Sequence, residues 1–64
     1  MTRGDVRRLV QEASIERIRG LLDRLQALKA HRPIADEAEK RFLLDLRDHE
    51  EFFKTLADQK LRGA

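Results

Sequence analysis

The sequence predicts an all-α protein, an antiparallel two-helix hairpin that dimerises into a four-helix bundle. Charged residues and hydrophobic residues each make up 41% of the 64 residues, a composition typical of long amphipathic helices. The only proline, Pro33, lies in the middle of the chain. On both sides of it, apolar residues recur at steps of three and four, which is the period of a helix face.

The first helix is expected at about residues 5–30. Its second half carries a broad apolar arc made of Ile15, Ile18, Leu21, Leu22, Leu25 and Leu28. The apolar residues that precede Ser14 point a quarter turn or more away from the centre of that arc. One interpretation is a break near Ser14, with its hydroxyl capping a second segment. We favour the other interpretation, a continuous helix whose start diverges from the arc.

A turn is expected at about residues 31–33. Pro33 lacks an N–H group and disfavours helical geometry at Arg32, so one helix should end here and the next begin. The flanking charges agree, because Lys29 suits a helix C-terminus and Asp36 suits a helix N-terminus. A connection this short makes the two helices antiparallel neighbours.

The second helix is expected at about residues 34–61, and the whole chain, 1–64, is expected to be one helical hairpin. One face of this helix carries Phe42, Leu46, His49, Phe53 and Leu56. The opposite face is charged, and several of its residues are spaced for ion pairs four positions apart.

A homodimer is expected because two helices alone leave much of the first arc uncovered. A chain this short often needs oligomerisation for stability, and it has no cysteine for a disulfide. Residues 1–32 carry a net charge of +4 and residues 33–64 a net charge of −2, which suits antiparallel packing. The predicted core or dimer seam consists of Ile18, Leu22, Leu25, Leu28, Phe42, Leu46, His49, Phe53 and Leu56.

No residue pattern indicates catalysis, and we expect no cofactor and no metal. His49 lies among apolar residues with Asp45 four positions earlier, but further inward carboxylates at metal-ligand spacing are missing, so a structural or interface histidine is favoured. Ser14 and Thr55 have no histidine at a short fixed spacing to act as a base. The three glycines are isolated, so no phosphate-binding loop is present.

The leading functional prediction is a small non-enzymatic protein–protein interaction module, an adaptor, regulator or accessory subunit that acts as a homodimer. An obligate subunit of a larger assembly is a related possibility. The main alternative is a nucleic-acid-binding regulator that uses the arginines of the first helix: Arg7, Arg8, Arg17, Arg19 and Arg24. Acidic residues share that helix, and the chain has neither tyrosine nor tryptophan to stack on bases, so nucleic acid is disfavoured.

No interaction with a membrane is expected, because the longest apolar runs have two or three residues. The N-terminal residues lack the apolar stretch of a signal peptide, so a cytoplasmic protein is expected. The predominance of arginine among the basic residues suggests a bacterial source.

Overall fold

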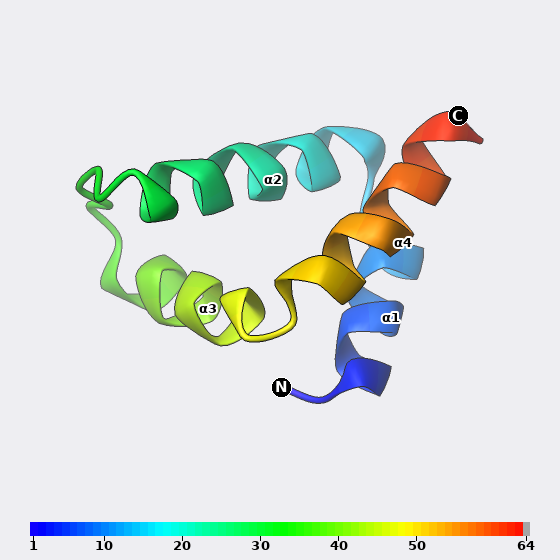
Figure 1. Ribbon diagram of the computed structural model, residues 1–64, viewed down its shortest axis with the longest axis horizontal. Helices are drawn as coiled ribbons and strands as arrows, with labels where there is room; N and C mark the ends of the chain where they lie inside the picture. The colour runs from blue at the N-terminus through cyan, green and yellow to red at the C-terminus, as the bar shows by residue number, and fades with distance from the viewer. Residues whose placement is uncertain (64) are drawn as a thin grey trace.

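The computed structural model describes residues 1–63, and over this range the chain is all-α, as predicted. It contains four helices, which are α1 (Arg3–Glu12), α2 (Ile15–Lys29), α3 (Glu37–Arg47) and α4 (Glu50–Arg62). α2 and α3 form an antiparallel pair, while α1 and α4 lie together at the end of the molecule opposite the α2–α3 loop (Figure 1). Each of the two long helices predicted from the sequence is therefore divided into two shorter ones.

The first break lies at Ala13 and Ser14, so the prediction of a continuous helix over residues 5–30 is wrong. Both residues have extended backbones, with ψ values of 145° and 163°. The Ser14 hydroxyl accepts a hydrogen bond of 3.1 Å from the backbone N–H of Arg17 and so caps α2. The break turns the chain enough for Val6 and Ile18, which a straight helix would point apart, to reach the same core.

The second break lies at Asp48 and His49, so the continuous helix over residues 34–61 is also wrong. Their backbone N–H groups donate to the carbonyls of Asp45 and Leu46, three residues back, at 3.3 and 2.9 Å. This tighter winding ends α3, and α4 then begins at Glu50.

The connection between α2 and α3 spans residues 30–36 and is longer than the predicted turn at 31–33. Pro33 lies inside this loop, and the helix that follows begins at Glu37 instead of residue 34. Asp36 starts that helix, because its Oδ1 accepts hydrogen bonds from the N–H groups of Ala38 and Glu39 at 2.9 and 3.3 Å.

The C-terminus of α2 ends in a left-handed residue, His31, with φ of 58°. The N–H of Arg32 donates to the carbonyl of Ala27 at 2.9 Å, and that of His31 to Leu28 at 3.1 Å. These two bonds define a Schellman motif, in which the position of His31 is usually occupied by glycine. An L-residue with a β-carbon is strained there.

Replacing His31 with glycine is therefore expected to stabilise the fold by about 1 kcal/mol, which in a domain this small raises the melting temperature by about 4–8 °C. Thermal unfolding followed by circular dichroism measures the change. Ala30→Gly is the matched control, because Ala30 has an ordinary φ of −81° and glycine there should only destabilise. Equal effects of the two substitutions would contradict the strain at His31.

The core is formed by buried apolar residues from all four helices of one chain: Val6, Val10, Ile18, Leu21, Leu25, Leu43, Leu46, Phe53 and Ala57. The longest dimension of the chain is 32 Å, whereas a helix of 26 residues alone would measure about 39 Å. The radius of gyration is 11.3 Å, close to the value of about 10.7 Å expected for a globular chain of this length. The four helices thus cover one another within a monomer.

The C-terminus of α1 is closed by a side chain from the far end of the sequence. Lys60, near the end of α4, donates hydrogen bonds from its Nζ to the carbonyls of Val10 at 2.6 Å and Gln11 at 3.0 Å, and also to the carbonyl of Ala13. α1 has no basic residue in its own last turn, so this ammonium group supplies the positive charge that a helix C-terminus favours. Because the end of α4 meets the end of α1, the two helices run in the same direction.

Candidate interaction surfaces

The residues predicted to form the core or dimer seam divide into two groups in the structure. Ile18, Leu25, Leu46 and Phe53 are buried within the single chain. Leu22, Leu28, Phe42, His49 and Leu56 are partly buried and lie at the edges of that core. Leu44, at 36%, is the exposed large hydrophobic residue of the described chain. Of the predicted seam, only this second, partly exposed group is therefore accessible to a partner.

His49 lies at the junction of α3 and α4 and faces the N-terminal residue. Its Nε2 lies 2.7 Å from the carbonyl oxygen of Met1, and because a carbonyl only accepts, Nε2 carries the donated proton. Asp45 does not orient the imidazole in the structure; its Oδ2 lies 3.3 Å from the amino group of Met1. Within residues 1–63, no three His, Asp or Glu side chains are grouped so that they could hold a metal ion.

Glu50, the first residue of α4, joins that helix to α2 through its carboxylate. Its Oε1 lies 2.6 Å from Nζ of Lys29 at the end of α2 and 2.9 Å from Nζ of Lys54 within α4. Hydrogen bonds from Lys29 and then Lys54 lower the pKa of Glu50, and the same contact raises the pKa of Lys54. The Glu50 side chain is only 16% exposed, so this cluster is part of the packed structure.

Acid is expected to weaken the fold through Glu50. Because the pKa of Glu50 in the folded chain is below its ordinary value of 4.5, its stabilisation is present above that pH and is lost as the pH falls through the lower, folded value. Glu50→Gln should reduce the unfolding free energy at pH 7 by no more than about 1 kcal/mol and should flatten its decline in acid.

Urea unfolding at a series of pH values between 7 and 2 measures both effects of Glu50→Gln. Glu51→Gln is the control, because Glu51 is also in the first turn of α4 but is exposed and makes no ion pair within residues 1–63. If the two variants showed the same decline in acid, the role assigned to Glu50 would be wrong.

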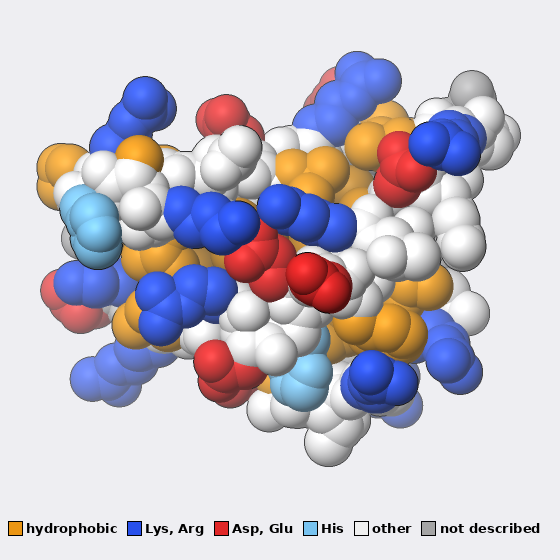
Figure 2. All heavy atoms as spheres, viewed as in Figure 1, with side chains coloured by type: hydrophobic (Ala, Val, Ile, Leu, Met, Phe, Trp, Pro, Cys, Tyr) orange, Lys and Arg blue, Asp and Glu red, His pale blue; other side chains and the backbone are white. Residues whose placement is uncertain are grey.

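The five arginines predicted as the alternative nucleic-acid site do not gather at one place. Arg7 lies on α1 with its guanidinium carbon 6.0 Å from the centre of the Phe52 ring. Arg24 forms an ion pair of 2.9 Å with Glu39. These two residues line a shallow depression, and Arg17 and Asp36 also line it. Arg8 and Arg19 are exposed elsewhere on α1 and α2. On the face in Figure 2, basic, acidic and hydrophobic side chains alternate, and no continuous basic field is seen.

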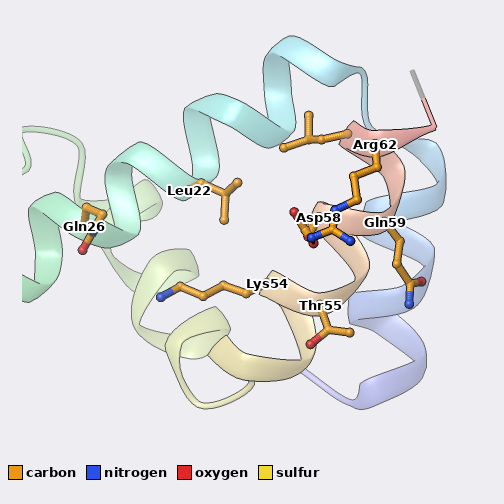
Figure 3. Close-up of a pocket in the computed structure, with 8 residues that line it drawn as sticks. Leu22, Gln26, Lys54, Thr55, Asp58, Gln59 and Arg62 are labelled. Carbon is orange, nitrogen blue, oxygen red and sulfur yellow. The ribbon is translucent and has the colours of Figure 1, made fainter.

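A groove of about 720 Å³ runs between α2 and α4. Leu22 points from α2 toward α4 across this groove, and Asp58 and Arg62 lie together on its α4 side (Figure 3). Leu61 contributes a second apolar side chain. The charges here are paired within the chain, Arg62 with Asp58 at 3.0 Å and Lys54 with Glu50.

A second groove, of about 550 Å³, lies between α1 and α4. Its residues are Arg7, Val10, Gln11, Leu56, Gln59 and Lys60, so it combines aliphatic side chains with amides and cations and includes no carboxylate. Gln59, whose side chain points away from Leu22 in Figure 3, lines this groove as well as the groove between α2 and α4. Sequence reasoning missed this groove, because it depends on α1 packing beside a helix about fifty residues away.

The fold and these surfaces define a small all-α protein in which a single chain forms a four-helix core with two grooves beside its last helix. Comparisons with protein-family models, curated proteins and solved structures found no significant match to the chain. No helix within residues 1–63 is long and apolar enough to cross a membrane.

Proposed function

We propose that this protein is a small non-enzymatic interaction module that binds another protein along α4. The observation that carries the proposal is the position of α4 between the two grooves, with Gln59 lining both of them. A helix with a groove on each side suits the binding of a partner helix, because ridges of side chains on the partner can pack into the grooves. Leu22, Leu56 and Leu61, the partly buried leucines of these grooves, would supply the apolar contact area.

The hydroxyl and imidazole side chains that could act in catalysis already form hydrogen bonds within the fold. Their use there supports the non-enzymatic part of the proposal. The Ser14 hydroxyl caps α2, and the Thr55 hydroxyl donates to the carbonyl of Glu51 at 2.9 Å. The imidazole of His49 is bonded to the carbonyl of Met1. The Ser14 hydroxyl thus serves a helix end, the Thr55 hydroxyl bonds within its own helix, and the His49 imidazole holds the N-terminal residue.

Binding to protein is favoured over binding to nucleic acid by the separation of the arginines and by the Arg24–Glu39 pair. The Phe52 ring, which a base could otherwise stack on, already contacts the guanidinium groups of Arg3 and Arg7 at 5.0 and 6.0 Å. Retention of labelled RNA or DNA at low salt, lost steeply as salt is added, would instead support the nucleic-acid alternative.

Self-association stays a prediction, although the packed core removes the need for a second chain to cover long helices. A homodimer would have to use partly exposed residues, such as Leu22, Phe42 and Leu44, in place of the buried residues of the predicted seam. Light scattering across a concentration series distinguishes the two states, and a constant monomer mass would remove the homodimer from the proposal.

Selection of displayed peptides against the folded protein tests the proposed function. We expect enriched peptides whose binding is weakened by Gln59→Trp, because a bulky uncharged ring at this exposed position obstructs both grooves. Lys40→Trp is the control, since Lys40 is exposed on α3 and lines neither groove. The absence of any enriched peptide, or equal binding to both variants, would overturn the proposal.

A further inference from the structure

The groove between α1 and α4 has a distinct charge. Arg7 and Lys60 line it together with Gln11 and Gln59, and no carboxylate is among its lining residues. Lys60 directs its ammonium group at the carbonyls that end α1, so its charge is partly satisfied within the fold. Arg7 makes no ion pair within residues 1–63, and its guanidinium group therefore remains available to an anion.

A second cation extends this surface toward the N-terminus of α1. Arg3 lies one turn before Arg7, with its guanidinium carbon 5.0 Å from the centre of the Phe52 ring. Arg3 also lacks an ion-pair partner within residues 1–63. Phe52 precedes Leu56 by one turn of α4, and its ring lies beside the guanidinium groups of both arginines. Arg3 and Phe52 line a separate depression with Asp48, Glu50 and Glu51, so Arg7 is the arginine that lines the α1–α4 groove itself.

The floor of the groove is aliphatic. Val10 and Leu56 lie on opposite sides, from α1 and α4, and Leu56 is partly exposed. An occupant must therefore present an apolar side chain to the floor and negative charge to the arginines, within about one helical turn of each other.

We propose that the α1–α4 groove binds an acidic amphipathic helix of a partner protein. An aliphatic side chain of that helix would enter between Val10 and Leu56, and its carboxylates would pair with Arg3 and Arg7. This inference rests on the proposed interaction function and names the chemistry of the partner. The groove between α2 and α4 lacks this preference, because its charges are paired within the chain.

Two synthetic helical peptides test the proposal directly. Both carry the same leucine pattern at steps of three and four, but one has glutamate and the other lysine at the flanking positions. We expect the glutamate peptide to bind, to weaken as salt is added, and to shift the backbone amide resonances of Gln11, Leu56 and Gln59 in ¹⁵N-labelled protein. The lysine peptide should not bind.

Arg7→Gln should weaken binding of the glutamate peptide by about tenfold, and Arg7→Lys should restore part of the loss. Arg19→Gln is the matched control, because Arg19 is an exposed arginine of α2 that lines neither groove. Arg7 is exposed, so the variants are expected to keep the helicity of the parent, which circular dichroism checks.

The results separate this inference from the proposed function. Equal binding of both peptides, or resonance shifts centred on Leu22 and Leu61, would overturn the acidic partner and leave an interaction module in place. If the glutamate peptide did not bind but peptide display enriched basic or uncharged sequences, the acidic partner would likewise be overturned and the interaction module would stay in place. Failure of both synthetic peptides together with an unenriched display library would overturn both proposals.

Discussion

Leu46→Asp is expected to unfold the monomer. Leu46 is 0% exposed and lies in the core that all four helices share. An aspartate there would be ionised and without a partner, at an energy cost of several kcal/mol, or would have to take up a proton. A chain of 64 residues has a total stability of about 3–10 kcal/mol, so the substitution removes most or all of it. Circular dichroism and urea unfolding at neutral pH should show loss of cooperative structure.

Leu44→Asp is the control, because it makes the same chemical change two residues away at a side chain that is 36% exposed. It should alter the unfolding free energy by about 0.5 kcal/mol or less, as surface substitutions usually do. If Leu46→Asp kept a cooperative, helical monomer, the core described here would be wrong. If it only dissociated a larger species, the core would belong to a dimer seam.

Lys60→Met is expected to destabilise the fold by about 1–2 kcal/mol and to loosen α1 in particular. Methionine keeps most of the length and apolar volume of the lysine stem but removes the ammonium group that binds the carbonyls of Val10, Gln11 and Ala13. α1 has only ten residues, too few for a stable isolated helix, so it depends on this contact and on packing against α4. Hydrogen exchange resolved by residue should show faster exchange in α1 than in α3.

Lys40→Met is the matched control for Lys60, because Lys40 lies exposed on α3 and makes no ion pair within residues 1–63. The unfolding free energy of the Lys40→Met variant and the hydrogen-exchange rates in its α1 should match those of the parent protein. Uniform acceleration of exchange over all four helices in Lys60→Met would show that the lysine supports the whole fold and has no particular role at the end of α1.

The helical class and the approximate place of the α2–α3 connection could be predicted from composition, periodicity and Pro33, because these are local properties. The apolar residues before Ser14 are out of phase with those after it, which made a break one interpretation, but the continuous helix that we favoured was wrong. The structure shows that a change of phase indicates a change of direction, because the helix must break for both faces to be buried in one core.

The break at His49 was harder to predict because Leu43, Leu46, Phe53 and Ala57 keep a helical spacing through it. The charged residues around His49 indicate the break, whereas the apolar spacing does not. Arg47 lies in the last turn of α3 and Glu50 and Glu51 lie in the first turn of α4, the arrangement expected at one helix end followed by a helix start. The face predicted for one continuous helix included Phe42 and not Leu43, although Leu43 is fully buried and Phe42 only partly.

The α1–α4 groove could not be predicted from local patterns. It requires the first and last helices to lie side by side in parallel, an arrangement that periodicity within either helix does not specify. Arg7 was considered only for the disfavoured nucleic-acid site, Leu56 was assigned to the core or dimer seam, and Gln59 was assigned to no surface, so the three were not brought together.

The contact of Lys60 with the end of α1 joins segments about fifty residues apart in the chain. Forming this contact costs the conformational entropy of closing a loop of that length, and the chain regains this entropy when the contact breaks. We therefore expect α1 and α4 to open and close as one cooperative unit, with a lower opening free energy than the α2–α3 pair. The proposed partner helix would bind only the closed form, so its concentration would set the fraction of molecules in which α1 and α4 are apart.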